Sequence, residues 1–177
     1  IEQVIDLQTE YENIKDDRRQ LDFEDVLLAT AGMIETEPSV ALQIREQYRF
    51  FVVDEYQDVS PLQQHLLGLW LGGRHDLCVV GDANQTIYSF AGARADYLTS
   101  FARSYENSTV VRLERNYRST AAIVDSANRL MKERTGSLTL RAASNSAQRG
   151  TKPTVTKFVS DAAEARGTAA IIAQLIT

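Results

Sequence analysis

The chain has 177 residues, of which 44% are hydrophobic and 24% charged, and its formal net charge is −5. This composition is typical of a soluble globular protein, and no apolar run approaches the ~20 residues that a membrane-spanning helix needs. The negative charge argues against a broad basic face for duplex DNA, but it permits a narrow groove that binds single strands by stacking. The single cysteine, Cys78, excludes a disulfide framework and indicates a reducing cytoplasmic location, with Cys78 as a small buried hydrophobe.

Helices are predicted in the first part of the chain wherever apolar residues recur at helical spacing. They cover residues 2–20, 23–34, 38–48 and 61–71. Asp22 and Ser60 are predicted N-caps, because a short polar side chain there can bond the exposed N–H groups of the first turn. Pro38 and Pro61 suit the first turn of a helix, and Gly72 ends the fourth one.

Three short apolar runs predict β-strands at 50–54, 77–80 and 110–113. Continuous apolar runs are typical of parallel strands that are buried on both faces. The segments between and after them are a predicted helix at 95–105, a helix at 120–134 capped by Ser119, an irregular crossing at 135–152, a strand at 154–159 and a last helix from Asp161. Strands that alternate with helices predict an α/β fold with a parallel sheet flanked by helices.

A cluster of polar residues follows each of the three predicted strands. The clusters are 54–58 (Asp-Glu-Tyr-Gln-Asp), 81–93 and 114–119 (Glu-Arg-Asn-Tyr-Arg-Ser). Ligands of open parallel sheets bind at the carboxyl ends of the strands, so we expect the clusters to share one edge. An acid pair, an amide and an arginine on one edge are what phosphoryl transfer requires: a Mg²⁺ site, a residue that orients water or senses phosphate, and a cation. Alternatively, Asp54 and Glu55 simply leave a strand into solvent.

The three clusters resemble motifs of the superfamily-1 DNA helicases of the UvrD/Rep/PcrA group. Val52–Gln63 resembles the Walker B motif (motif II), Val79–Ala93 resembles motif III, and Leu113–Ser119 resembles motif IV. Asp22–Leu27 also resembles the segment where the family's chain re-enters its first RecA-like domain. Because three long motifs occur in order, the resemblance is specific, and it covers about residues 10–176 by pattern.

The resemblance implies a role for each polar or aromatic residue of these motifs. Asp54 would bind Mg²⁺, and Glu55 would activate the hydrolytic water of ATP. Gln85 would contact the γ-phosphate, Arg118 would reach it, and Tyr117 would lie against the nucleotide base. Tyr88 and Phe90 would stack on bases of single-stranded DNA, and Gln57, Asp58 and Asp82 would couple the two sites. Stacking on aromatic rings tolerates any base sequence, as a translocating motor requires.

The sequence departs from the family pattern at two positions. Phe90 stands where many members have tryptophan, and Ala91 stands where many have arginine. The strand-like spacing of Tyr88 and Phe90 leaves open that one or both belong to a core. A catalytically silent DNA-binding module, a motor-core piece of a helicase–nuclease subunit and a plain metal-dependent phosphohydrolase are alternative functions.

The phosphate-cradling loop Gly-x-x-x-x-Gly-Lys-Ser/Thr (Walker A) is absent, because none of the four lysines follows a glycine. The later arginine-bearing motifs of the family are not visible either. The chain also begins at Ile1 without a basic-then-apolar leader. We therefore expect an internal piece of an ATP-dependent helicase that acts on single-stranded DNA and single-strand/duplex junctions, without hydrolytic activity on its own.

The domain organisation implied by the resemblance is an incomplete RecA-like, P-loop NTPase-type sheet. Residues 1–21 would end an inserted helical subdomain, and residues 22–134 would form the C-terminal portion of the first RecA-like domain. Residues 135–152 would be the irregular crossing, and residues 153–177 would begin the second RecA-like domain.

Overall fold

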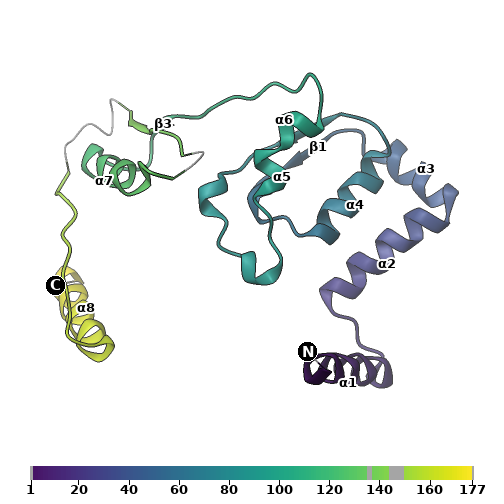
Figure 1. Cartoon of the computed structure of the whole chain (residues 1–177), viewed down its shortest axis with the longest axis horizontal. Helices are drawn as coiled ribbons and strands as arrows, with labels where there is room; N and C mark the ends of the chain where they lie inside the picture. The colour runs from purple at the N-terminus through teal and green to yellow at the C-terminus, as the bar shows by residue number, and fades with distance from the viewer. Residues whose placement is uncertain (1, 135–136, 144–149, 177) are drawn as a thin grey trace. The chain divides into compact units, whose positions relative to one another are not determined.

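The structure is a computed structural model that describes residues 2–134, 137–143 and 150–176. It divides into two compact units, Ile1–Val110 and Val111–Thr177. Figure 1 labels helices α1 to α8 and strands β1 and β3. The division falls earlier in the chain than the crossing at 135–152 that composition indicates. No helix in the described ranges is both long and apolar enough to cross a membrane.

Four helices of the first unit begin and end close to their predicted positions. They are α1 (Glu2–Arg18), α2 (Phe23–Thr36), α3 (Pro38–Gln47) and α4 (Pro61–Leu71). The predicted N-caps are confirmed: Asp22 accepts a hydrogen bond from the N–H of Asp25, and Ser60 accepts one from the N–H of Gln63. Gly72 ends α4 in the left-handed conformation, with φ of 56°, which a residue without a side chain adopts at little cost.

The first unit contains a two-stranded parallel sheet of β1 (Phe51–Val53) and β2 (Leu77–Val79). Phe51 pairs with Leu77, and Val53 pairs with Val79. Two further hydrogen bonds extend the pairing beyond the strands, from the N–H of Val80 to Val53 O at 2.8 Å and from the N–H of Tyr56 to Val80 O at 2.9 Å. The prediction of parallel pairing is confirmed for these strands, and the pairing brings the two following loops together.

Helix α4 separates two hydrophobic clusters, as its place between the β1 region and α2–α3 in Figure 1 shows. Leu66 packs with buried residues of α2 and α3 on one side. Leu67 and Leu71 pack with Tyr56 and the inward side chains of both strands on the other. The helix therefore holds the carboxyl ends of the strands at a fixed position in the unit.

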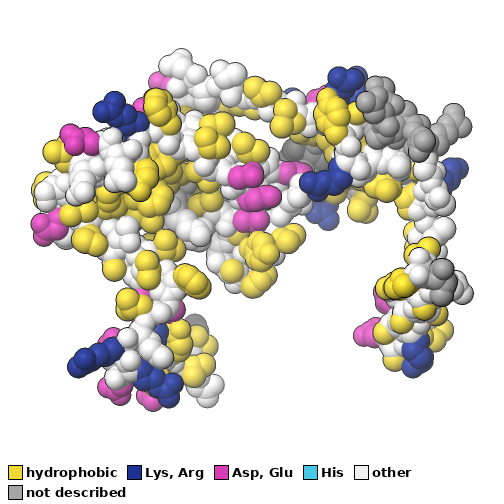
Figure 2. All heavy atoms as spheres, turned by 180° about the vertical axis from the view of Figure 1, so that it is seen from behind, with side chains coloured by type: hydrophobic (Ala, Val, Ile, Leu, Met, Phe, Trp, Pro, Cys, Tyr) yellow, Lys and Arg dark blue, Asp and Glu magenta, His cyan; other side chains and the backbone are white. Residues whose placement is uncertain are grey.

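The prediction that the strands are buried on both faces is wrong. Val52 is 76% exposed, and Cys78, predicted to be buried, is exposed beside it in the register. The neighbours of Val52 and Cys78 along each strand face the core, so burial alternates as it does in a sheet with one covered face. Exposed hydrophobic side chains are widespread on the surface that Figure 2 shows, with acidic side chains gathered beside some of them.

The chain after β2 forms short helical segments rather than the predicted long helix at 95–105. They are η2 (Ala83–Gln85), η3 (Ser89–Ala91), α5 (Asp96–Thr99) and α6 (Phe101–Ser104). A similar short segment, η1 (Tyr56–Asp58), lies between β1 and α4. The helix breaks at Ser100, whose ψ is 0° and whose hydroxyl donates to the carbonyl of Asp96. A serine hydroxyl that competes for a backbone carbonyl weakens a continuous helix.

The second unit contains β3 (Arg115–Asn116), α7 (Ala121–Met131), β4 (Arg141–Ala142) and α8 (Asp161–Ile176). Strands β3 and β4 pair in parallel, and the Asn128 side chain bonds both backbone groups of Leu140. The predicted strands at 110–113 and 154–159 are not formed. Apolar side chains there lie in solvent, as Val111 (73% exposed) and Val155 (99% exposed) illustrate, and no described strand pairs with them.

Two other predictions for the second unit have different outcomes. The predicted capping of α7 by Ser119 is wrong, because the N-cap is Thr120 and its side chain makes no capping hydrogen bond. The segment predicted as an irregular crossing contains β4, while residues 135–136 and 144–149 of that segment lie outside the described residues.

Candidate functional site

The acid pair lies directly after β1, and both of its side chains are exposed. The N–H of Glu55 donates to Oδ1 of Asp54 at 2.9 Å. Glu55 has a φ of 51°, which is uncommon for a residue other than glycine. This left-handed residue turns the chain sharply from the strand into η1, so the two carboxylates stand at the end of the sheet. Backbone strain of this kind concentrates at functional sites.

Gln57 ties the acid pair to the loop after β2. It is 1% exposed, and its Nε2 donates to Oε2 of Glu55 at 2.8 Å and to Oδ2 of Asp58 at 3.3 Å. Its Oε1 accepts from the N–H of Asp82 at 3.0 Å. One buried amide therefore spans both loops. A Cβ added to Gly81 would lie 2.5 Å from that Oε1, so the close approach requires glycine.

Asp82 organises the loop that carries Gln85. Its Oδ1 accepts from the N–H of Asn84 at 3.0 Å, and its Oδ2 accepts from Nε2 of Gln85 at 3.0 Å. Partial burial acts to raise the pKa of Asp82, but the hydrogen bonds from Gln85 and Asn84 outweigh it and hold the pKa below its usual value. The carboxylate is therefore charged and holds Gln85, which is exposed, beside the loop of Gln57.

The aromatic pair of this loop lies on the surface. Tyr88 is 50% exposed and Phe90 is 85% exposed, with ring centroids 6.1 Å apart and ring planes tilted by 48°. Tyr88 is the N-cap of η3 and Phe90 lies within η3, so neither residue belongs to a strand. Gly92 ends η3 with a φ of 88°. The alternative that these rings belong to a core is therefore wrong.

Two cavities lie next to these loops. The first has a volume of about 390 Å³, and Asp54, Glu55 and Asp58 line it together with apolar residues such as Leu27. The second has a volume of about 290 Å³, and its walls include Tyr88, Ala91 and Phe23. Both cavities are lined by Leu27, Asp58 and Gln63. Oδ1 of Asp58 is buried without a hydrogen-bond partner in the described part of the chain.

Phe23 is a residue of this site that the sequence analysis missed. It is 91% exposed at the first position of α2 and lines the second cavity with Tyr88. Its spacing from Leu27, Ala31 and Ile34 continues the apolar stripe of α2, and that pattern predicts a core residue. Only the structure reveals that the hydrophobic cluster ends before the first turn, so no local signal in the sequence would have identified Phe23.

Tyr117 and Arg118 belong to the second unit, where they follow β3. Oδ1 of Asn116 accepts the N–H groups of Arg118 at 3.0 Å and Ser119 at 2.7 Å. This side-chain-capped turn leaves Tyr117 72% exposed and Arg118 exposed, with the Arg115 guanidinium 6.0 Å from the Tyr117 ring. The expectation that all three polar clusters follow strands of one sheet is wrong, because β3 pairs with β4 and not with β1 or β2.

The structure thus brings together two of the three clusters. The predicted residues around the β1–β2 sheet are Asp54, Glu55, Gln57, Asp58, Asp82, Gln85, Tyr88 and Phe90. The described residues hold no group of three or more histidine, cysteine, aspartate or glutamate side chains arranged to bind a metal ion.

Two family descriptions match adjacent parts of the chain. The UvrD/REP helicase N-terminal domain matches residues 1–106, and the UvrD-like helicase C-terminal domain matches residues 111–177. The chain belongs to the UvrD/Rep helicase family. The gap between the matches lies at the division between the two compact units, at Val110 and Val111.

Curated relatives of this UvrD/Rep family member are named as DNA helicases. The ATP-dependent DNA helicase UvrD2 of Mycobacterium tuberculosis (strain ATCC 25618 / H37Rv) is 48% identical over 98% of this chain and 26% of its own length. The ATP-dependent DNA helicase PcrA of Leuconostoc citreum is 35% identical over 72% of this chain and 17% of its own length. The ATP-dependent DNA helicase PcrA of Staphylococcus aureus (strain Mu50 / ATCC 700699) is 38% identical over 63% of this chain and 15% of its own length. The chain spans about a quarter of the length of the UvrD2 relatives.

Proposed function

We propose that this chain is a part of an ATP-dependent DNA helicase that couples Mg-ATP hydrolysis to movement on single-stranded DNA and to unwinding at single-strand/duplex junctions. The observation that carries the proposal is the Gln57 amide, which bonds both the acid pair loop and the loop of Gln85. The family membership and the relatives named as ATP-dependent DNA helicases support it. We also propose a role in DNA repair or replication and, from the single cysteine, a cytoplasmic location.

In this proposal Asp54 holds Mg²⁺ through its carboxylate. Its Oδ1 accepts the Glu55 N–H, and its other oxygen has no hydrogen-bond partner among the described residues, so the donor fits a hard cation. Mg²⁺ in such sites is bound by one or two carboxylates together with waters and substrate phosphates. Bound Mg-ATP would supply the phosphoanhydride bond and the charge that balances the phosphates.

Glu55 is the proposed catalytic base that orients and deprotonates the attacking water. The hydrogen bond from Gln57 fixes one of its oxygens, while the other has no hydrogen-bond partner in the described ranges. A base that is held by one oxygen and open at the other is oriented for proton transfer. In the same proposal Gln85 contacts the γ-phosphate, and the second unit supplies Tyr117 against the nucleotide base and Arg118 for the phosphate charge.

Nucleic acid binds, in our proposal, at the exposed aromatic residues Tyr88 and Phe90. Tyr88 lines the second cavity together with Phe23, and the Phe90 ring lies beside Tyr88. The formal charge of −5 makes stacking a better source of affinity than a basic surface. Gln57, Asp58 and Asp82 couple this surface to the acid pair, because Asp58 lines both cavities and bonds Gln57.

We further propose a RecA-like fold for the first unit, with α1 as the end of an inserted helical subdomain. The sequence places the start of a second RecA-like domain at residue 153; we propose that it begins with the second unit, at Val111, in line with the C-terminal family match. A motor-core piece of a helicase–nuclease subunit is the alternative, and it uses the same residues. A non-hydrolytic DNA-binding module is disfavoured, because the acid pair, Gln85 and Arg118 are all present.

Binding of a fluorescein-labelled oligothymidylate to the 177-residue chain tests this proposal by fluorescence anisotropy. Tyr88→Ala and Phe90→Ala are each expected to weaken binding about tenfold, as the loss of one stacking platform does. Phe50→Ala is the matched control, because Phe50 is 79% exposed and directly precedes β1, at the opposite end of the strand from the acid pair. Equal effects of Phe90→Ala and Phe50→Ala would contradict the proposed surface.

A further inference from the structure

Helix α1 contacts the rest of its unit chiefly through its one buried residue, Lys15. Lys15 is 7% exposed and is the buried residue of α1, whereas the apolar side chains of the helix, such as Val4 and Leu7, are mostly exposed. Helices normally dock through an apolar stripe. The docking of α1 is therefore polar and is concentrated at one ammonium group.

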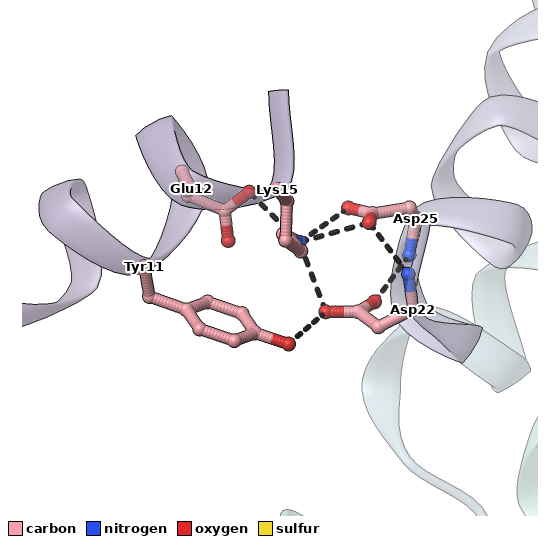
Figure 3. Close-up of polar contacts among 5 residues, drawn as sticks. All are labelled: Tyr11, Glu12, Lys15, Asp22 and Asp25. Atoms are coloured by element: carbon pink, nitrogen blue, oxygen red, sulfur yellow. Dashed lines mark hydrogen bonds and ion pairs between the residues drawn. The ribbon is translucent and has the colours of Figure 1, made fainter. Parts of the chain in front are cut away.

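The ammonium group of Lys15 lies among three carboxylates, as Figure 3 shows. Its Nζ lies 2.8 Å from Oε2 of Glu12, 2.9 Å from Oδ2 of Asp22 and 2.8 Å from Oδ2 of Asp25. The Tyr11 hydroxyl also donates to Oδ2 of Asp22, at 3.0 Å. Burial acts to lower the pKa of Lys15, but the hydrogen bonds to Asp25, Glu12 and Asp22 outweigh it and raise the pKa, so the group is charged.

Two of these carboxylates form the capping box of α2. Oδ1 of Asp22 accepts the N–H of Asp25 at 2.9 Å, and Oδ2 of Asp25 accepts the N–H of Asp22 at 2.9 Å. Phe23 and Glu24 lie between them in the sequence and line the cavity that Tyr88 also lines. Lys15 therefore binds Asp22 and Asp25, which flank the two cavity-lining residues Phe23 and Glu24 in the sequence.

We propose that Lys15 is a positioning residue for nucleic-acid binding, because it locks α1 onto the capping box and so fixes the Phe23 wall of the base-binding cavity. This inference rests on the proposed function, since the ligand is a base of single-stranded DNA. Lys15 is buried and its three carboxylate partners are partly exposed. Such an ionic cluster is weak evidence of stability, and its best-attested use is to specify one arrangement. A displacement of α1 is transmitted to Phe23 through Asp22 and Asp25.

Oligothymidylate affinity of the 177-residue chain, measured by fluorescence anisotropy, tests the inference with a double-mutant cycle. Phe23→Ala is expected to weaken binding about tenfold, and Lys15→Met about threefold or more, by loosening the Phe23 ring. The double variant is expected to bind no more weakly than Phe23→Ala alone, because Lys15 acts only through that ring. Lys157→Met, which removes an exposed lysine of the second unit, is the control for loss of charge.

Each outcome of the cycle has one meaning. Additive effects of Lys15→Met and Phe23→Ala, or an unchanged affinity of Lys15→Met, would overturn the positioning role while leaving the base-binding cavity intact. An unchanged affinity of Phe23→Ala would contradict the proposed cavity itself, and the inference about Lys15 falls with it. If circular dichroism shows that Lys15→Met does not fold, Asp25→Asn replaces it in the cycle, because the amide oxygen can still cap α2 while the charge is lost.

Discussion

The side-chain amide of Gln57 donates to the carboxylate of Glu55 at 2.8 Å from a position that is 1% exposed. The other end of the same amide accepts the N–H of Asp82 at 3.0 Å. An amide can satisfy a carboxylate and an N–H at once, whereas a carboxylate or a hydrocarbon in its place cannot. The Gln57 side chain therefore links the acid pair after β1 to the backbone conformation of the loop after β2.

Gln57→Glu is expected to destabilise the 177-residue chain by about 2 kcal/mol at neutral pH, because a second carboxylate would face Glu55 without a donor. Urea unfolding followed by circular dichroism measures the change. Gln43→Glu is the control, since Gln43 is exposed on α3 and is expected to change the free energy of unfolding by less than about 0.5 kcal/mol. Equal stabilities of the two variants would show that the Gln57 bonds are not formed in solution.

Gly81→Ala is expected to destabilise the chain by about 1–3 kcal/mol, because the added Cβ would overlap the buried carbonyl of Gln57 and force it away. Gly32→Ala is the matched control. Gly32 lies within α2 with no atom within 4 Å of an added Cβ, so alanine there is expected to stabilise the helix by about 0.5–1 kcal/mol. Urea unfolding distinguishes the two, and a stabilising effect of Gly81→Ala would contradict the close approach.

The chain is expected to lose folding stability in alkaline solution because the Tyr56 phenol is buried. Burial raises its pKa to about 12, from an ordinary value of about 10 in an unfolded chain. The neutral phenol is favoured in the folded state, so its contribution is full below about pH 10 and is lost as the pH rises toward 12. Tyr56→Phe removes this dependence and also the hydrogen bond to Oε1 of Gln64 at 2.6 Å, at a cost of about 1 kcal/mol near neutral pH.

Free energies of unfolding at about pH 8 and about pH 11 test this expectation for both proteins. The difference in stability between Tyr56→Phe and the unsubstituted chain is expected to shrink at the higher pH. Tyr117→Phe, at an exposed position, serves as the control. A difference that stays constant over this range would contradict the burial of the Tyr56 hydroxyl.

Local chemistry explains which features of the fold could be predicted. Asp22, Ser60, Pro61 and Gly72 act on backbone groups within a few residues of themselves, so their positions in the sequence determine the helix ends. The strands predicted from apolar content at 110–113 and 154–159 failed, because a strand exists only where a partner offers hydrogen bonds. In the second unit the partners are Arg115–Asn116 and Arg141–Ala142, which have little apolar character.

The candidate site likewise has features that the sequence predicts and features that only the structure shows. The acid pair and the aromatic residues follow a sequence pattern, and the exposed positions of Asp54, Glu55, Tyr88 and Phe90 agree with a role at a surface. The hydrogen bond from Asp82 to Gln57 joins residues of different loops, and the place of Phe23 depends on where the hydrophobic cluster ends. Such features depend on packing between distant segments, which a sequence pattern does not contain.

DNA-stimulated ATP hydrolysis by the full-length protein that carries this chain, with Glu55→Gln introduced, tests the central claim most directly. The substitution removes a base while keeping a similar shape, and turnover is expected to fall at least about 100-fold with little change in oligonucleotide affinity. Glu106→Gln, at an exposed residue of the first unit, is expected to leave turnover within about twofold of the unsubstituted protein. Turnover by Glu55→Gln equal to that of Glu106→Gln would contradict the assignment of the catalytic base.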